Sequence, residues 1–261
     1  MIPELSSVGL AFPQWQDALE SAYASGHLVV AGEVNGGQLL QYDDASGSRL
    51  MILAAPPFGS FASLSSGIPH VAHVSMVNDV IGVIDIVSDS PALQTAGQDA
   101  PVLASVTATV CQGPLIVDAG DQQYQQISLA ALASDVTVSQ VAPDVSAASA
   151  LPVGSVEPTG LRDLNSGAAA PHAGSRICVA ADSVEARTSH LTGQKFYVAT
   201  VRNPFEFSLA LPASALDTLD TGASAAPIYV TGTVQFSGSI QDPAGCSGDS
   251  CGCGDCGCGG H

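Results

Sequence analysis

HLVVAGEVNGGQLLQYDDASGSRLMILA, residues 27–54, is the stretch that decides the fold class. Apolar and polar side chains alternate along most of it with a period of two, which is typical of strands that bury one face. Asn35-Gly36-Gly37 and residues 43–47 interrupt this alternation with residue types that favour tight turns. The stretch therefore predicts three consecutive antiparallel strands.

The same signals recur along the chain, and a helix precedes them. Pro13 suits the first turn of a helix and Gly26 suits its end, so a helix is predicted over residues 13–24. Its apolar stripe consists of Trp15, Ala18, Leu19, Ala22 and Tyr23. Strands are predicted at 27–34, 38–42, 49–54, 70–77, 80–87, 102–111, 176–183, 195–201, 205–211 and 228–236. This order predicts a mainly β (α+β) protein with a small antiparallel barrel or sandwich.

The pattern of the chain changes near residue 142. Residues 142–174 are rich in Ala, Ser, Pro and Gly and have no sustained periodicity, so they are interpreted as a linker or an extended segment. This predicts a helix and β domain at 1–141, a second β unit at 175–243 and a flexible Cys/Gly-rich tail at 244–261. Whether the two β regions share one sheet stays open.

Composition excludes several classes of function. The formal net charge is −18 because 24 Asp and Glu face only six Lys and Arg, which argues against nucleic acid and anionic membranes as partners. The N-terminus shows no signal peptide, and the longest apolar stretch, residues 70–87, is interrupted by Asn78, Asp79 and Asp85. We therefore expect a cytoplasmic protein with a protein partner, and a homo-oligomer stays open.

The last sixteen residues, CSGDSCGCGDCGCGGH, carry the clearest chemistry in the chain. They hold a set of thiols and one imidazole suited to metal binding: Cys246, Cys251, Cys253, Cys256, Cys258 and His261. Clustered thiolates bind Zn²⁺, Cu(I) and iron–sulfur clusters, and the many glycines let a short peptide wrap around an ion. The spacing lacks the two separated Cys-x₂-Cys knuckles of a zinc ribbon, so a mononuclear zinc finger is not predicted.

Three interpretations of this segment remain open. It loads or transfers a soft metal, it exchanges disulfides, or it is a low-complexity end with no selected ligand set. Asp249 and Asp255 make the segment anionic, which attracts cations and opposes a reactive thiolate. The metal interpretation is therefore the leading one.

The rest of the chain offers weaker candidates. His70 and His73 point to opposite faces of a strand, so they are predicted to be two separate histidines, and His190 lacks a nucleophile motif nearby. Cys111 and Cys178 lie in apolar strands and are predicted to be buried structural thiols. Five of the six basic residues fall between residues 162 and 202: Arg162, Arg176, Arg187, Lys195 and Arg202. They either line a pocket for a phosphate or carboxylate, or are scattered over a surface in ion pairs.

The order of predicted elements also resembles a known family. The resemblance covers roughly residues 13–200 and rests on a leading helix followed by the segments 26–34, 38–53, 70–91, 101–110 and 176–193. This order of elements is similar to that of actinobacterial split-barrel proteins related to haem utilisation and to pyridoxamine-phosphate oxidases. The resemblance implies haem or FMN bound in a β groove, with Arg176, Arg187, Lys195 and Arg202 as the residues that hold its acidic groups. This chain differs in continuing as strands and ending in cysteines.

The leading hypothesis from the sequence is a non-enzymatic metal-handling protein. The cysteine-rich segment binds a soft metal and the β body recognises a partner. The alternatives are a split-barrel haem- or flavin-binding protein or oxidoreductase, and a structural assembly subunit.

Overall fold

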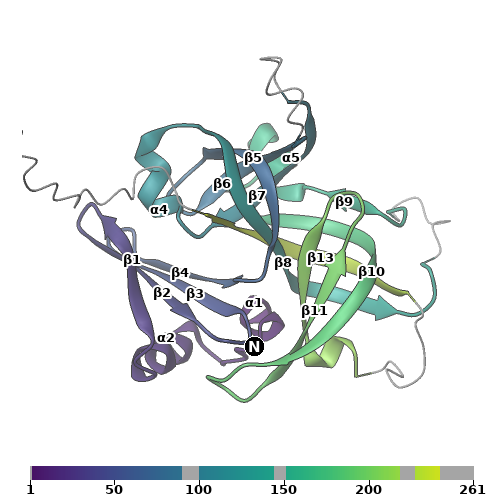
Figure 1. Ribbon diagram of the computed structural model, residues 1–261, viewed down its shortest axis with the longest axis horizontal. Coiled ribbons are helices and arrows are strands. Elements are labelled where there is room, and N and C mark those ends of the chain that lie inside the picture. Colours follow the sequence, from purple (N-terminus) through teal and green to yellow (C-terminus); the bar gives the residue numbers. More distant parts are fainter. Residues whose placement is uncertain (1, 90–99, 144–150, 218–226, 242–261) are drawn as a thin grey trace, which may run out of the picture.

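The computed structural model describes residues 2–89, 100–143, 151–217 and 227–241, and it confirms a mainly β fold. Two sheets dominate the molecule (Figure 1). The smaller is an antiparallel meander of β1 (Leu28–Val34), β2 (Gly37–Asp43), β3 (Ser48–Ala54) and β4 (Gly59–Leu64). Its first three strands match the prediction from residues 27–54 to within a residue.

The larger sheet contains nine strands within the described residues. Their bounds are β5 (Ile68–Met76), β6 (Ile81–Val87), β7 (Val102–Val110), β8 (Gln122–Ser139), β9 (Ser155–Glu157), β10 (Gly174–Thr188), β11 (Lys195–Val201), β12 (Phe207–Pro212) and β13 (Ile228–Ile240). The helices are short: α1 (Pro3–Ser7), α2 (Trp15–Ala24), α4 (Gly113–Ile116) and α5 (Thr159–Ser166), with 3₁₀ turns at Val117–Ala119 and Ala213–Ala215.

Two long strands, β8 and β13, organise the larger sheet. They pair antiparallel from Tyr229 opposite Ser139 to Ile240 opposite Ile127. One closed circuit of paired strands runs from β8 through β5, β6 and β7 to β13, and a second runs from β13 through β10, β11 and β12 to β8. Both circuits therefore share the β8–β13 pair. Two short pairings, β12 with β8 and β13 with β7, are parallel, so the sheet is not purely antiparallel as predicted.

The interior of these circuits is apolar. Its largest side chains include Phe207 and Phe236, which are fully buried, and Phe205, which contacts both with ring centroids 5.4 and 5.8 Å away. Burying each such ring stabilises the fold by about 1.5–3 kcal/mol. A second apolar cluster fills the space between the two sheets and includes Leu132 and Leu50. The large sheet is thus covered on its outer face by the small sheet and the N-terminal helices.

Strand β8 was missed by the sequence analysis because it belongs to both clusters. Ala131 and Ala133 face the interior of the circuits, whereas Ala130 and Leu132 face the small sheet. A strand buried on both faces reads as an apolar run without alternation, and the alternation is what the prediction relied on.

The predicted helix corresponds to α2, which starts at Trp15, two residues after the predicted start at Pro13. Ala18 and Ala22 are buried as predicted. Tyr23 is 81% exposed, so its place on the predicted apolar stripe is wrong. The helix packs against the small sheet through Ala18 and Ala22, which share a cluster with Tyr42 and Leu50.

The expected division at residue 141 does not separate two sheets. Strand β8, which precedes it, is paired along its length with β13, which follows it. The expected linker at 142–174 contains β9 and α5 in its described part. The two predicted β units therefore share one sheet. The predicted tail at 244–261 lies outside the described residues. Within the described part of the chain, no helix combines the length and apolar character needed to cross a membrane.

Candidate functional site

The predicted metal ligands all lie beyond the described residues. They are Cys246, Cys251, Cys253, Cys256, Cys258 and His261. The structure describes the end of β13 and Gln241, which precede this segment. Ile240 is buried and donates its backbone N–H to Gln112 Oε1 at 2.8 Å, and Gln241 donates its own to the carbonyl of Gln126 at 2.9 Å. The fold is therefore anchored five residues before the first cysteine of the segment.

The two cysteines of the body are buried, as predicted. Burial raises the pKa of the Cys178 thiol, which disfavours the reactive thiolate. Cys111 Sγ lies 3.3 Å from the Ser63 hydroxyl and beside the Arg49 guanidinium. Among the described residues, no group of three or more His, Cys, Asp or Glu side chains is arranged to hold a metal ion.

His70 and His73 do not share a site, in agreement with the prediction for a strand. His70 Nε2 donates to the backbone carbonyl of Glu206 at 2.6 Å. His73 Nδ1 accepts the backbone N–H of Tyr124 at 3.2 Å and stacks edge-on against its ring. Each imidazole therefore has its own structural partner. His190 is exposed on the turn between β10 and β11.

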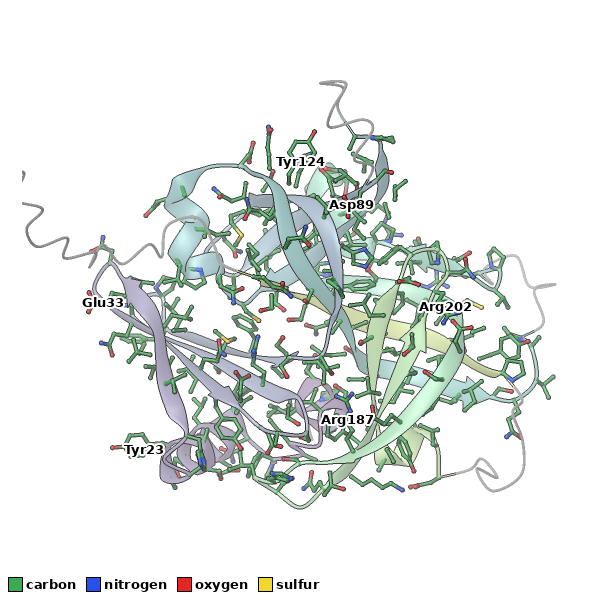
Figure 2. The ribbon with its side chains drawn as sticks, in the orientation of Figure 1. Tyr23, Glu33, Asp89, Tyr124, Arg187 and Arg202 are labelled. Atoms are coloured by element: carbon green, nitrogen blue, oxygen red, sulfur yellow. The ribbon has the colours of Figure 1, made fainter. Side chains whose placement is uncertain are left out.

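The four bases expected to line one pocket are dispersed along β10 and β11. Arg176 pairs with Glu157 at 2.8 Å, and Arg187 lies eleven residues further along β10, a strand contour of about 36 Å. Lys195 begins β11 with its ammonium 4.9 Å over the Tyr197 ring, and Arg202 follows the far end of that strand. Figure 2 shows Arg187 and Arg202 at separate places on the molecule.

These bases also have acidic or polar partners. Arg187 pairs with Glu185 at 2.8 Å and donates to Ser66 Oγ at 2.7 Å, and Arg202 lies 3.6 Å from Asp182. The structure does not bring the four residues together, so the predicted shared pocket for a flavin phosphate or haem propionate is not formed by them. Arg176, Arg187 and Arg202 each have an acidic partner, and Lys195 lies over the Tyr197 ring.

A row of polar residues forms hydrogen bonds between the two sheets, and the sequence analysis did not identify it. Gln235, Ser237 and Ser239 lie at alternate positions of β13, so they point to one face, toward the small sheet. Gln235 donates to Glu4, and Ser237 donates to Ser63 Oγ at 2.8 Å. Ser239 accepts a hydrogen bond from Arg49 Nη1 at 3.0 Å. We call this row of β13 side chains and its partners the polar seam.

The polar seam continues beyond β13 at one end. Gln112 donates to Ser239 Oγ at 3.2 Å, and Arg49 forms an ion pair with Asp43 at 2.5 Å. Burial opposes the charge of Arg49, but Asp43 and the Cys111 sulfur raise its pKa above the ordinary value. At this end the polar seam therefore links the Arg49 guanidinium and the Cys111 thiol to serine hydroxyls.

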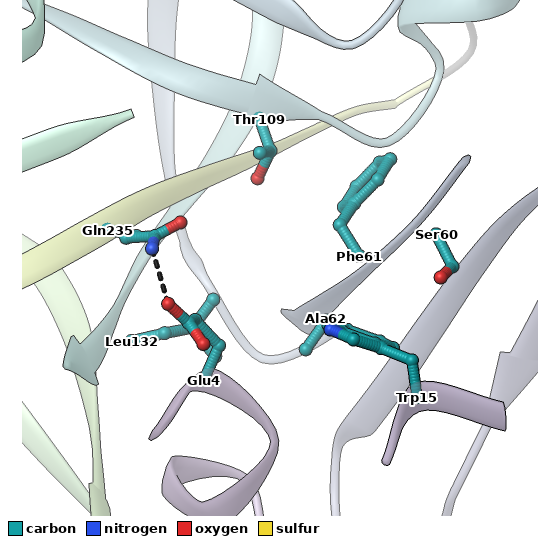
Figure 3. Close-up of a pocket in the computed structure, with 8 residues that line it drawn as sticks. All are labelled: Glu4, Trp15, Ser60, Phe61, Ala62, Thr109, Leu132 and Gln235. Atoms are coloured by element: carbon teal, nitrogen blue, oxygen red, sulfur yellow. Dashed lines mark hydrogen bonds between the residues drawn. The ribbon is translucent and has the colours of Figure 1, made fainter. Parts of the chain in front are cut away.

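The other end of the polar seam opens into a cavity of about 220 Å³ between the two sheets and the N-terminal helices (Figure 3). Its walls come from α1, α2, β4, β7, β8 and β13, and the lining residues are Glu4, Trp15, Ser60, Phe61, Ala62, Thr109, Leu132 and Gln235. In Figure 3, Trp15 and Phe61 lie on one side and Glu4 and Gln235 on the other. The cavity thus combines a carboxylate, an amide, two hydroxyls and two aromatic rings.

A buried carboxylate, Asp44, ties the small sheet to the β10–β11 turn. Its Oδ2 accepts the backbone N–H groups of His190 at 2.8 Å and Leu191 at 3.1 Å, and its Oδ1 accepts that of Ser46 at 2.8 Å. Burial acts to raise the pKa of Asp44, but these hydrogen bonds outweigh it and hold the pKa below its usual value. Burial and the nearby Asp44 raise the pKa of Tyr42 to about 12, so its hydroxyl stays protonated and donates to Asp44 at 3.2 Å.

No protein-family model, curated protein or solved structure matches this chain. The resemblance to split-barrel proteins therefore stays a prediction. The function has to be argued from the residues themselves.

Proposed function

We propose that this protein binds a soft transition metal, as Zn²⁺, Cu(I) or an iron–sulfur cluster, through its C-terminal cysteine cluster, and that the β body recognises a protein partner. The observation that carries this proposal is the density of ligands: five thiols and one imidazole within residues 246–261. Thiolates at this density bind soft ions without a preformed scaffold, because the metal itself supplies the free energy that organises them.

The chemistry of the two parts supports assigning metal binding to the cysteine-rich segment rather than to the β body. The segment contains no apolar side chain other than cysteine, and the described part of the chain before it ends with a backbone hydrogen bond from Gln241 to Gln126. The cysteines of the body are buried, and Cys178 has a raised pKa, so its thiol is a poor competitor for the metal. The thiols of the segment are therefore better candidates for metal ligands than those of the body.

Metal competition on the full chain tests the proposal. The protein is titrated with Zn²⁺ and with Cu(I) against a chromophoric chelator, beside the variant with Cys251, Cys253, Cys256 and Cys258 all changed to Ser. We expect at least one tight site in the natural chain and its loss in the quadruple variant, because serine hydroxyls do not replace thiolates as soft-metal ligands. Metal binding should also release protons from the thiols.

The matched control is Cys178→Ala, which removes one thiol from the body and should leave the stoichiometry unchanged. Elemental analysis of the protein as purified identifies which metal it carries. Equal metal binding by the natural chain and the quadruple variant would contradict the proposal. So would a chain whose cysteines exchange disulfides readily but hold no metal.

A further inference from the structure

The cavity at the open end of the polar seam has the features of a small-molecule site. Its lining residues come from six elements spread over the whole chain, from Glu4 in α1 to Gln235 in β13. It lies where two separately packed sheets meet, with an apolar cluster on either side of the large sheet. Pockets of proteins concentrate at such junctions, and polar groups converging on one point are what distinguish a site from a packing defect.

The charge of the cavity selects the class of ligand. Glu4 is partly buried, and its carboxylate accepts a hydrogen bond from Gln235 Nε2, which fixes the orientation of the side chain. Within the described residues, no Lys, Arg or His side chain forms an ion pair with Glu4. A carboxylate in a partly desolvated pocket favours a cation, and the net charge of −18 raises the local concentration of cations further.

The aromatic residues favour an organic cation over a metal ion. Trp15 and Phe61 line the side of the cavity that faces Glu4 (Figure 3). Indole is the aromatic ring that attracts an ammonium group most strongly, and its face also packs against methylene groups. A bare divalent ion prefers several carboxylate or carbonyl oxygens, whereas this cavity is lined by one carboxylate, one amide and two hydroxyls.

The size of the cavity limits the ligand to a few non-hydrogen atoms. Its volume of about 220 Å³ is below the range of about 300–1,000 Å³ typical of sites for drug-sized molecules. We propose that the cavity between α1, α2, β4 and β13 binds a small organic ammonium ion, with Glu4 as its counter-ion and Trp15 against its alkyl part. This site is independent of the cysteine cluster.

Fluorescence offers a direct test, because Trp15 is the single tryptophan of the chain. The full-length protein is titrated with n-butylammonium chloride at constant ionic strength, and with n-butanol as the neutral probe of the same shape. We expect saturable quenching or a spectral shift with an affinity on the order of 1 mM for the ammonium ion, which suits so small a ligand. The alcohol should bind at least about tenfold more weakly, since it lacks the charge.

Two variants locate the binding. Glu4→Gln keeps the shape and the bond to Gln235 but removes the charge, and it should weaken butylammonium binding by about tenfold or more. The matched control is Glu20→Gln, on the exposed surface of α2, which should bind as the natural protein does. If Glu4→Gln does not fold, as judged by thermal unfolding, Trp15→Leu followed by calorimetry replaces it and should also weaken binding. Equal binding by the variant and the natural protein, equal binding of butanol and butylammonium, or no saturable signal would each overturn the proposal.

Discussion

Asp44 shows how a single residue joins distant parts of this chain. It belongs to the β2–β3 turn, yet it accepts hydrogen bonds from residues 190 and 191, which are some 146 positions away. Asp44 is 6% exposed, and three of its donors are backbone N–H groups, those of Ser46, His190 and Leu191. Replacing such an acceptor leaves buried donors unpaired, which costs more than the lost bonds alone.

We predict that Asp44→Asn lowers the free energy of unfolding by about 1.5–3 kcal/mol at pH 7, because the amide is neutral and offers one acceptor oxygen instead of two. The folded-state pKa of Asp44 is below the unfolded value of about 3.9, so its stabilising effect is present above that pH and is lost as the pH falls through the folded-state pKa. The difference between the two proteins should therefore narrow in acid. Urea unfolding from pH 7 downward measures it, with the exposed Asp118→Asn as control. A constant difference at all pH values would argue against an ionised Asp44 in the folded protein.

At the scale of elements, the paired strands β8 and β13 hold the larger sheet together. Each takes part in both closed circuits, and their ladder has one register shift, between Thr233 and Val234. Gly232 precedes this irregularity with φ of +139°, and a Cβ there would lie 2.1 Å from the carbonyl oxygen of Asp135. The close approach of the two strands thus depends on the absence of a side chain.

We predict that Gly232→Ala destabilises the protein by at least about 2 kcal/mol more than Gly120→Ala, because backbone strain and overpacking add at the first site. Gly120 also has positive φ, at +75°, but nothing lies within 4 Å of a Cβ placed there. The control therefore isolates the steric contact from the cost of the left-handed backbone. Thermal or urea unfolding of the two variants measures their loss of unfolding free energy. Equal losses would contradict the prediction and mean that the strands at the β8–β13 contact move apart easily.

The elements also show what sequence reasoning captured and where it stopped. β1, β2 and β3 were found because the turn residues at 35–37 and 43–47 separate them into short runs rich in apolar residues. β8 was missed because it is buried on both faces along its middle, and β13 was ended too early at Phe236 because Ser237-Gly238-Ser239 resembles a turn. Those small residues instead lie within β13, on the face that meets the small sheet, where Ser237 and Ser239 belong to the polar seam.

The candidate sites differ in the same way. The cysteine cluster is contiguous, so residue types and spacing alone suggest its chemistry. The cavity is not contiguous: Glu4 and Gln235 are 231 positions apart and meet only because the chain returns to the N-terminal helix through β13. The dispersal of the four bases has the same origin, since residues near one another in sequence lie far apart along an extended strand such as β10: Arg176, Arg187, Lys195 and Arg202.

At the scale of the whole molecule, the body and the cysteine-rich segment are chemically distinct. The body buries most of its apolar side chains in two main clusters, and its two cysteines are buried as well. The segment 246–261 combines Gly, Ser and Asp with five thiols and a terminal histidine. If the segment binds the metal and the body supplies the folded stability, as we propose, each property should respond to its own set of changes.

Deletion of Cys246–His261 tests this division most directly, by measuring bound metal per chain and the thermal midpoint on the same samples. We predict that the deletion removes the tightly bound soft metal while the midpoint stays within about 2 °C of the natural chain, a change of less than 1 kcal/mol for a protein of this size. Metal retained by the shortened chain, or a midpoint lowered by many degrees, would contradict the proposal that the cysteine cluster binds the metal independently of the β body.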